Sequence, residues 1–573
     1  MCADILSLYN KSECDYFSPK LISSRSALKL NLASCLSKSN IPSDKMYIAQ
    51  NEIFGWYSKT ISDLNLIVPS EPYDILVGIN GLDGTPYVDR LPVSTSGGFC
   101  HKGRKDKYLK LVESIPEHEV CYILAPEIQK EYNLLLLRYQ NGLRGNVVWE
   151  FNFKDEPISM KKVMANKCRI FNSGPLHFMV LFRQYYLWTI PIFSGSNRHL
   201  FGMAIGANAF GEDWDVLYNH LVKYGKNRII AGDYKAFDKN MSGEVIMSAF
   251  EILMDIAAVY GWSDEDILVM RGLATDVAFP LTNCFGTLME LNGSNPSGHP
   301  LTTVINGIVN LIYLHVACYL IREEYGLEDK KMISECLSVL TYGDDNIMSS
   351  NVDEFNHVNI SSALFKCGIE YTMADKVSES IPFINIKDAD FLKRRFVRNT
   401  NVRGSVAAPL DEKSIVKSMT MCTLSRTISF EEQCAQILET ASREYYQYGK
   451  DVFEKKKKMI EDILDKYSLR GYLVDSRLKT YSELRLLYDG YIEEKLHAQC
   501  DHPRRKLPLK FRYDGLYGGC WIRYDGWWYC FSDVMYYIFG YREELLFPLL
   551  FLLFLFVKYF DVYNYWKDME PEL

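Results

Sequence analysis

Apolar and polar positions along the chain fall into blocks that predict helices. Residues 244–260 carry apolar side chains at helical spacing, and an acidic turn after Ser263 begins a second predicted helix. A longer apolar stripe predicts a third helix over residues 302–324, directly after a loop rich in glycine and proline at 293–300. Residues 410–470 have a further helical pattern. The pattern therefore predicts several long helices in the second half of the chain.

Shorter apolar runs predict strands between these helices. The run Ile229-Ile230-Ala231-Gly232 predicts a strand that delivers Asp233 at its end. Residues 337–340 and 347–349 flank Tyr342-Gly343-Asp344-Asp345 and predict a β-hairpin. Residues 75–81 also predict a short strand that ends in turn residues.

The predicted hairpin would hold two adjacent carboxylates at its tip. Because successive strand side chains face opposite ways, neighbouring Asp344 and Asp345 can share a site only where a turn bends the chain. Acids on an apolar hairpin are costly unless a cation neutralises them, which indicates a divalent metal site. A simple polar turn is the alternative, since Gly-Asp is common turn chemistry. Asp233 is a further candidate ligand, or else a helix N-cap.

Composition narrows these possibilities. The 573 residues suffice for several domains, and a hydrophobic content of 48% can fill a sizeable core. A net charge of −8 argues against a uniformly basic nucleic-acid-binding surface but allows a local basic channel. The 15 cysteines include no Cys-x2-Cys pair, so we expect reduced thiols rather than zinc ribbons or disulfides. The amino terminus predicts no signal peptide.

Two amino-terminal segments could contact phosphates. Residues 94–99 contain two glycines and precede a basic stretch, which suits close approach of a nucleic-acid backbone or, alternatively, a flexible solvated loop. Lys154 precedes a second basic segment, in which Lys167 and Arg169 stand two residues apart. On a strand they would share a face suited to a triphosphate.

The carboxyl-terminal residues differ in character. Residues 545–557 form an unbroken apolar run, shorter than the roughly 20 residues of a membrane span. This run could be an interfacial membrane anchor or a core element.

Several motifs stand in an order that resembles the RNA-dependent RNA polymerases of picornavirus-like positive-strand RNA viruses. The resemblance covers about residues 90–420, and among these viruses the dicistrovirus, iflavirus and marine picorna-like enzymes are most similar. Any one motif alone would be weak. The motifs are Asp233-x4-Asp238, Ser297-Gly298-x3-Thr302-x3-Asn306, Tyr342-Gly343-Asp344-Asp345, Ala374-Asp375-Lys376 and Phe391-Leu392-Lys393-Arg394.

The resemblance implies an α+β fold, a right-hand polymerase with fingers, a palm whose antiparallel sheet is backed by helices, and a helical thumb. Residues 1–215 would form the amino-terminal region and fingers. Residues 216–396 would form the palm, with a fingers insertion near 262–292. Residues 397–500 would form the thumb, and residues 501–573 an aromatic and apolar extension of unknown role.

The resemblance also implies roles for individual residues. Asp233, Asp344 and Asp345 would ligate two Mg2+ ions, with Mn2+ as an alternative and Asp345 secondary, and Lys376 would protonate the leaving pyrophosphate. The ribonucleotide would be bound by Asp238, Ser297, Gly298, Thr302, Asn306, Lys154, Lys167 and Arg169. RNA would be bound by Thr95, Ser96, Gly97, Lys393 and Arg394.

The expected function is template-directed RNA synthesis that replicates a viral genome. Its partners would be an RNA template and primer, ribonucleoside triphosphates and, by the resemblance, a protein primer. It would act in the host cytoplasm at membrane-associated replication sites, with residues 545–557 as a candidate membrane contact. The alternatives are a reverse transcriptase, against which an acid at Asp238 argues, and a non-catalytic RNA-binding or membrane-scaffold protein.

Overall fold

The computed structural model describes most of the chain in two separate units. The first unit, Met1–Gln499, is described at residues 1–9, 16–18, 22–36, 38–112, 121–328, 331–398, 406–422, 424–425 and 427–495. The second unit is described only at three strands, β17 (Lys510–Asp514), β18 (Gly519–Tyr524) and β19 (Trp527–Cys530), which form one antiparallel sheet. The apolar run at 545–557 lies outside the described residues.

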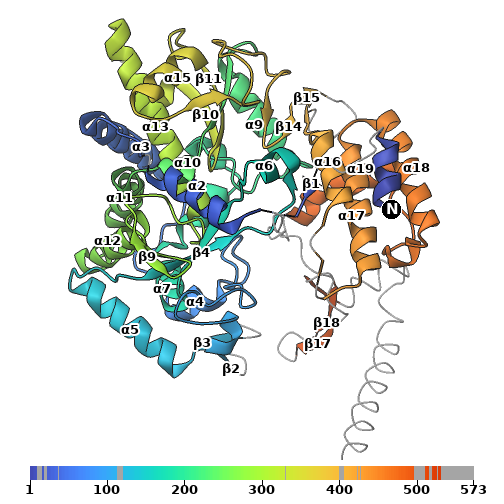
Figure 1. Ribbon diagram of the computed structural model, residues 1–573, viewed down its shortest axis with the longest axis horizontal. Coiled ribbons are helices and arrows are strands. Elements are labelled where there is room, and N and C mark those ends of the chain that lie inside the picture. The colour runs from blue at the N-terminus through green and yellow to red at the C-terminus, as the bar shows by residue number, and fades with distance from the viewer. Residues whose placement is uncertain are drawn as a thin grey trace, which may run out of the picture. The chain divides into compact units, whose positions relative to one another are not determined.

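The first unit contains a four-stranded antiparallel sheet, whose strands β10 and β11 lie in the upper part of Figure 1. Its strand order is β10 (Leu337–Tyr342), β11 (Asp345–Ser350), β7 (Ile229–Tyr234) and β12 (Tyr371–Met373). The hairpin predicted around Gly343 is confirmed, because β10 and β11 pair without a break from Leu337↔Ser350 to Tyr342↔Asp345.

Strand alternation divides this sheet between two hydrophobic cores. Ile230, Val339 and Met348 pack into one core, where α13 (Thr302–Tyr325) and α15 (His357–Lys366) contact the sheet. Ile229 and Leu340 pack into the other core, where α9 (Asp213–Leu221) contacts β10 and β11. Burial on both faces explains why the strands are continuous apolar runs.

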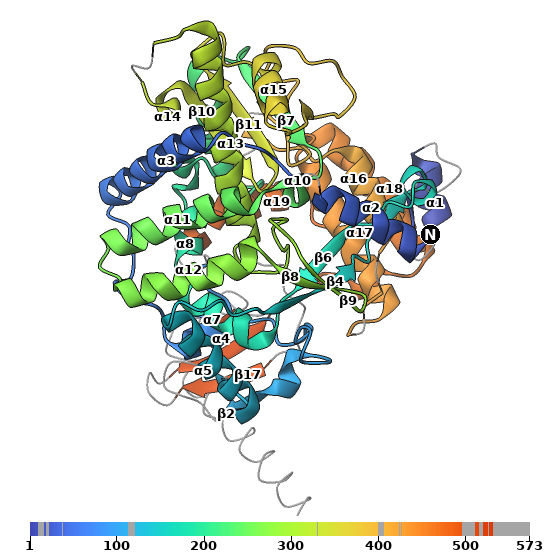
Figure 2. The same ribbon diagram turned by 60° about the vertical axis from the view of Figure 1, so that its left-hand side comes forward.

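Helix α13 is the most deeply buried long helix of the predicted set. It packs against α3 (Ser43–Asp63), α11 (Gly243–Val259) and α15 (Figure 2). By length and composition it could cross a membrane, but 94% of its most apolar window is buried inside the protein. His315 is also buried on α13, as a core histidine rather than an exposed ligand.

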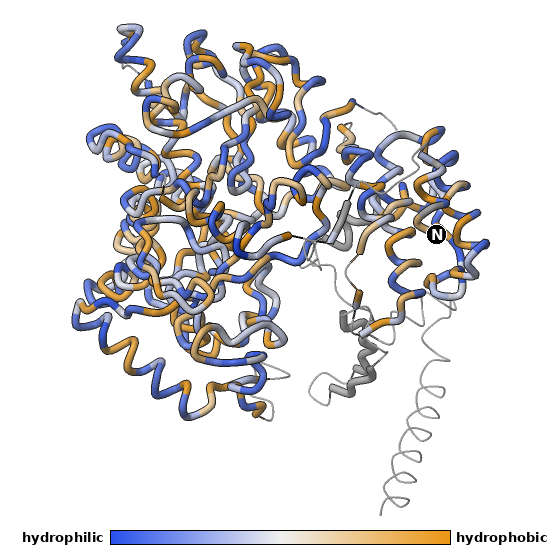
Figure 3. The backbone as a smooth tube through the Cα atoms, in the orientation of Figure 1, coloured by the Kyte–Doolittle hydropathy of each residue, from blue (hydrophilic) through white to orange (hydrophobic). Residues whose placement is uncertain are grey.

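A second, mixed sheet joins two distant parts of the chain. Its strand order is β6 (Ile170–Ser173), β4 (Val148–Phe153), β8 (Leu281–Cys284) and β9 (Thr287–Glu290), and β4 pairs with β8 in parallel. Helix α12 (Asp264–Ala278) packs against α5 (Pro126–Gln140) and α7 (Leu176–Tyr186). Apolar and polar stretches alternate along α5, as expected for a helix that buries one face (Figure 3).

Helices near the carboxyl end of the first unit enclose a separate core. They are α16 (Glu412–Thr420), α17 (Phe430–Tyr446), α18 (Lys450–Lys466) and α19 (Tyr481–Lys495). Ile5 on α1 (Cys2–Leu8) is buried in the same core.

Besides α4, which is described below, the remaining elements with at least three residues are α2 (Ser24–Leu36), β2 (Leu109–Val112), β3 (Cys121–Leu124), α6 (Met160–Met164), α8 (Thr189–Ser194), α10 (Phe237–Asn240), α14 (Ile333–Cys336) and four 3-10 helices, Lys105–Tyr108, Arg198–Phe201, Val222–Tyr224 and Arg470–Tyr472. The shortest strands are β1 (Tyr16–Phe17), β5 (Ile158–Ser159), β13 (Asp390–Phe391), β14 (Arg394–Arg395), β15 (Val397–Arg398) and β16 (Val406–Ala407).

Two local predictions are wrong. Residues 75–81 do not form a strand; Ile75–Asn80 is the helix α4, whose first turn is capped by Asp74 accepting from the Leu76 N–H. A short apolar run does not distinguish a buried helix from a strand, and the capping aspartate was the missed signal. Lys167 and Arg169 lie in the segment before β6, so they do not share a strand face.

Candidate active site

The pairing of β7 with β11 brings the predicted acids together at one end of these two strands. Gly232 pairs with Asn346, so the antiparallel register continued by one residue sets Asp233 opposite Asp345. Asp344 occupies the turn between β10 and β11. Strand pairing therefore brings together acids that lie more than a hundred positions apart in the sequence.

The three carboxylates form an electrostatically unfavourable set without a cation. Burial and, after it, the negative charges of Asp344 and Asp233 raise the pKa of Asp345 to about 6, against the lowering effect of Lys376. Asp344 is exposed at the surface, but the surrounding protein removes part of its hydration and so raises its pKa. The negative charges of Asp238 and Asp233 raise this pKa as well. The oxygens of the three acids do not all lie within 4.8 Å of one another. A cluster of carboxylate oxygens fits a hard divalent cation.

Lys376 supplies a positive charge at the edge of this set. Its Nζ lies 2.5 Å from Oδ2 of Asp233. Its backbone has a φ of +63°, and its N–H donates to the Met373 carbonyl, so a tight turn after β12 aims the side chain back at the sheet. A left-handed lysine is uncommon and marks a constrained position.

A buried asparagine holds the acid-bearing turn in place. Asn310 on α13 donates to the carbonyls of Gly343 (3.1 Å) and Asp344 (3.2 Å), and accepts from the Tyr234 hydroxyl (3.0 Å). Sequence reasoning missed Asn310. Its spacing of four residues from Asn306 was an available signal, since such residues share a helix face.

Gly232 is the residue that allows the sheet to pack here. A Cβ at this position would overlap the ring of Tyr371, whose hydroxyl donates to Oδ1 of Asn346 (2.7 Å). Tyr371 thus lies against the backbone next to Asp233 and fixes β12 to the neighbouring strands.

A hydrogen-bonded relay orients Asn306. Its Oδ1 accepts from Nδ2 of Asn295 (2.7 Å), whose own Oδ1 lies 2.8 Å from Nε2 of His299. Burial lowers the pKa of His299 to about 3, so this ring is neutral. Thr302 donates to the His299 carbonyl (2.7 Å), while Ser297 is half-buried nearby in the chain.

Gly298 permits a close approach between the loop before α13 and strand β6. A Cβ at Gly298 would overlap the carbonyl oxygen of Asn172. The predicted set Ser297, Gly298, Thr302 and Asn306 is thus positioned by one loop and the first turn of one helix.

Asp238 lies on α10, which is held by the amino-terminal segment. Lys38 donates from Nζ to the Lys239 carbonyl (2.6 Å) and to the hydroxyl of Ser294. Lys239 in turn donates to the side chain of Asn31. Burial lowers the pKa of Lys38 to about 8. Nothing in the sequence distinguishes Lys38 from a surface lysine, and it was missed.

The predicted basic contacts differ in how strongly the protein already engages them. Lys154 and Arg169 lie 3.6 Å and 3.4 Å from Oε2 of Glu156, and Lys167 is exposed. The charge of Arg169 lowers the pKa of Asp344, although burial has the larger, opposite effect. Arg169 is therefore close enough to the acids to act on them electrostatically.

Lys393 and Arg394 have different surroundings. Lys393 is exposed at the tip of the β13–β14 hairpin. Arg394 makes a bidentate pair with Glu444 on α17 (2.8 and 2.9 Å) and donates to the Ala408 carbonyl (2.8 Å). Its guanidinium is therefore committed to protein contacts. Lys417 on α16 was missed by sequence reasoning. Burial is the main cause that lowers its pKa, and the nearby positive charges of Lys393 and Arg169 lower it as well.

The loop at Thr95–Gly97 is ordered by its own contacts. Thr95 accepts from Lys105 (2.6 Å) and donates to the Pro92 carbonyl (2.7 Å), and the Ser96 hydroxyl accepts from the Gly98 N–H (3.2 Å). Thr95 and Ser96 remain exposed, while Gly97 is buried.

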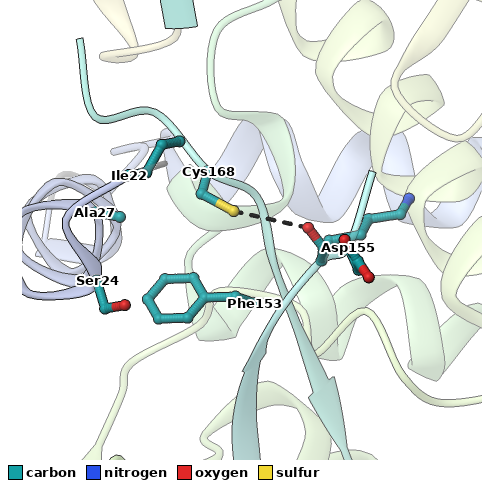
Figure 4. Close-up of a pocket in the computed structure, with 7 residues that line it drawn as sticks. Ile22, Ser24, Ala27, Phe153, Asp155 and Cys168 are labelled. Atoms are coloured by element: carbon teal, nitrogen blue, oxygen red, sulfur yellow. Dashed lines mark hydrogen bonds between the residues drawn. The ribbon is translucent and has the colours of Figure 1, made fainter. Parts of the chain in front are cut away.

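A pocket of about 410 Å³ lies beside the basic segment rather than at the acids. It lies between the α2 region and the β4–β6 segment, and Cys168 points across it toward the Lys154 carbonyl, 3.7 Å from its sulfur (Figure 4). Its lining is mixed, with the apolar side chains of Ile22, Ala27 and Phe153 beside the polar ones of Ser24, Lys154 and Asp155. This pocket offers no carboxylate cluster for nucleotidyl chemistry.

Comparison with known proteins shows what this chain is similar to. A family model for viral RNA-dependent RNA polymerase matches residues 23–459. The chain is 29% identical over 352 residues to the replicase polyprotein of Cricket paralysis virus, covering 59% of the chain and 20% of that protein. It is 29% identical over 423 residues to the replicase polyprotein of Acute bee paralysis virus, covering 70% of the chain and 22% of that protein.

More distant similarities agree with these. The genome polyprotein of Deformed wing virus is 28% identical over 407 residues, 66% of the chain and 14% of that protein. The chain thus spans about a fifth or less of the length of these polyproteins. The Sicinivirus 3Dpol RNA dependent RNA polymerase structure superposes with a TM-score of 0.62 at 18% identity, over 80% of this chain and 87% of that one. The expected α+β right-hand fold is confirmed by this likeness.

Proposed function

The chain belongs to the viral RNA-dependent RNA polymerase family, and on that basis we propose that it joins ribonucleoside triphosphates on an RNA template to replicate a viral genome. The observation that carries the proposal is the β7–β11 register, which sets Asp233 opposite Asp345 and next to the turn with Asp344. Strand pairing, rather than a loop, sets where these acids lie, which suits a reaction that depends on exact positions.

The enzymes of this family use divalent metal ions, and we assign the ions here as two Mg2+, with Mn2+ as an alternative. Asp233 and Asp344 would hold both ions and Asp345 would assist. The raised pKa of Asp344 and of Asp345 supports this, because like charges that are close together and partly removed from water favour a bound cation. When bound, such ions activate the attacking 3′-hydroxyl and stabilise the leaving oxygen.

Lys376 is the proposed general acid. Its contact with Asp233 places an ammonium group beside the proposed metal ligands, where it can give a proton to the leaving pyrophosphate. Lys154, Lys167 and Arg169 would neutralise the triphosphate, and the 3.4–3.6 Å ion pairs with Glu156 hold two of these side chains until phosphate replaces the carboxylate.

Asp238, Ser297 and Asn306, supported by Gly298 and Thr302, would recognise the ribose. The relay through Asn295 and His299 supports Asn306 as a preoriented amide. A hydroxyl-reading site rejects the deoxy analogue because its polar groups are then left unpaired.

Thr95, Ser96, Gly97 and Lys393 would contact RNA directly. Arg394 is assigned a supporting role, since Glu444 and a carbonyl already occupy its donors. Two finer assignments come from the family likeness. The first is a protein primer that is linked through tyrosine, and the second is replication at membranes in the host cytoplasm. Any membrane contact through residues 545–557 lies outside the described residues.

We assign the domains accordingly: 1–215 as amino-terminal region and fingers, 216–396 as palm with a fingers insertion near 262–292, 397–500 as thumb and 501–573 as extension. The parallel pairing of β8 with β4 supports an insertion that returns to the fingers. The separate core around α16 to α19 supports a helical thumb.

Primer extension on a poly-ribonucleotide template, with ribonucleotides and deoxyribonucleotides offered separately, tests the proposed function. We expect extension with ribonucleotides in the presence of Mg2+. Preferential use of deoxyribonucleotides would indicate a reverse transcriptase. Binding of RNA without synthesis, with either Mg2+ or Mn2+, would indicate a non-catalytic protein, and either result would overturn the proposal.

A further inference from the structure

A group of three potential metal ligands lies outside the carboxylate site. His101 lies in the loop after Gly98, Glu131 on α5 and His177 on α7. One ligand atom from each lies within 4.8 Å of the other two. Among the described residues this is the only such group of three histidine, cysteine, aspartate or glutamate side chains.

The geometry of the group suits convergence on one point. Oε2 of Glu131 lies 2.8 Å from Nε2 of His101 and 3.1 Å from Nδ1 of His177. The two rings are nearly perpendicular, with an interplanar angle of 85° and centroids 5.6 Å apart. Donor atoms about 2.0–2.2 Å from a tetrahedral zinc ion lie roughly 3.4 Å apart, so small side-chain rotations would admit the ion.

Nε2 of His101 is hydrogen-bonded to Oε2 of Glu131 (2.8 Å), but one ring nitrogen of each histidine is left without a partner in the described part of the chain. Nδ1 of His177 and Nδ1 of His101 are buried and have no hydrogen-bond partner among the described residues. The approach of His177 to Glu131 therefore does not have hydrogen-bond geometry, although it is short.

The group is buried on the side of the two histidines and open to solvent on the side of Glu131. The side chains of His101 and His177 are only 4% and 14% exposed, whereas Glu131 is 44% exposed. A metal held by two imidazoles and one carboxylate would thus retain a fourth position for water. Two nitrogens and one oxygen suit zinc, whereas Mg2+ prefers oxygen ligands and would select the aspartates instead.

We propose that His101, Glu131 and His177 bind one zinc ion, which ties the loop carrying Thr95–Gly97 to α5 and α7. The loop is already joined to this region, because the His101 N–H donates to the Gly98 carbonyl (3.2 Å) and the Leu176 N–H donates to the Gly97 carbonyl (2.9 Å). Helices α5 and α7 pack against each other (Figure 2). The ion would fix the loop without entering the nucleotidyl-transfer site.

Cobalt titration of the full chain, after chelation and dialysis, tests this site directly. Tetrahedral Co2+ gives a visible absorption band, and we expect one equivalent to bind and then to be displaced by Zn2+. Glu131→Gln, in a partly exposed side chain that need not disturb the core, should weaken Co2+ binding at least about tenfold. His177→Gln should do the same.

Glu127→Gln is the matched control, because Glu127 is exposed one turn earlier on α5 and should bind Co2+ as the unmodified chain does. Asp344→Asn should also retain the band, which separates this site from the proposed catalytic ions. In a second readout, Zn2+ should raise the melting temperature of the chelated unmodified chain but not of Glu131→Gln. No tetrahedral band in the unmodified chain, or equal affinity in Glu131→Gln, would overturn the proposal.

Discussion

The ammonium of Lys376 lies 2.5 Å from the carboxylate of Asp233, which joins a turn after β12 to the end of β7. This pair can serve two purposes, neutralising an acid or delivering a proton. Replacing lysine by arginine separates them, because arginine keeps the charge but does not release its proton near neutral pH.

Lys376→Arg should therefore slow single-turnover nucleotide incorporation by at least about tenfold, with little change in the apparent nucleotide affinity. Rapid-quench kinetics measures both quantities. Lys235→Met is a control, since Lys235 is exposed and its ammonium pairs with Glu370. An unchanged incorporation rate in Lys376→Arg would restrict Lys376 to charge neutralisation.

Lys38→Met should reduce discrimination between ribonucleotides and 2′-deoxyribonucleotides. Loss of the hydrogen bonds to the Lys239 carbonyl and to Ser294 would loosen α10, which carries Asp238. Hydrogen bonds to charged groups contribute about 1.5–3 kcal/mol, so we expect the ratio of kcat/KM values to fall about tenfold. Lys29→Met on α2, at an exposed position, should leave the ratio unchanged. A uniform loss of activity toward both sugars would contradict a positioning role for Lys38.

Gly298→Ala should destabilise the protein and impair synthesis. The added methyl group would overlap the Asn172 carbonyl and force apart the loop before α13 and strand β6, at a cost of about 1–3 kcal/mol. Thermal unfolding measures the change. Gly55→Ala on α3 is the control, because Gly55 is exposed, a Cβ there contacts nothing, and alanine should stabilise the helix by about 1 kcal/mol. A neutral Gly298→Ala would show that the two segments separate easily.

Glu52 should make stability depend on acid pH. Burial alone would raise the pKa of this carboxyl, but His315, the Tyr319 hydroxyl and the Ser334 N–H around it lower the pKa to about 2. Because the folded pKa lies below the ordinary glutamate value of 4.5, the stabilisation is complete above about pH 4.5 and is lost as the pH falls toward 2.

Glu52→Gln should therefore lower the urea midpoint at pH 7, and the difference from the unmodified chain should shrink toward pH 3. Glu324→Gln, which removes an exposed pair with Lys366, is the control and should have little effect at either pH. A difference that is the same at pH 7 and pH 3 would contradict this account of Glu52.

The sequence predicted the parts of the fold that depend on local patterns. The hairpin around Gly343 and the helix over residues 302–324 could be predicted because their apolar spacing is long and regular. The apolar spacing could not predict helix α4, because six residues have no period that separates a helix from a strand, and the capping Asp74 was the only signal.

Site residues were predictable where they form an ordered motif, and not where packing alone recruits them. Asn310 and Lys38 act through backbone carbonyls of the turn at Gly343 and of α10. The spacing of Asn310 from Asn306 was the one signal in the sequence, and Lys38 had none. Arg394 shows the converse, since a basic residue in a motif is engaged by Glu444 on a distant helix. The cluster of His101, Glu131 and His177 has no recognisable spacing, because three separate segments supply it.

The most direct test of the central claim is the rate of single-nucleotide incorporation by Asp344→Asn, measured together with RNA affinity. If Asp344 holds the proposed catalytic ions, incorporation should fall to background while RNA binding, which depends mainly on phosphate contacts, changes little. Glu379→Gln, at an exposed acid three residues beyond Lys376, should behave as the unmodified chain. Incorporation by Asp344→Asn at the unmodified rate would contradict the assignment of the active site.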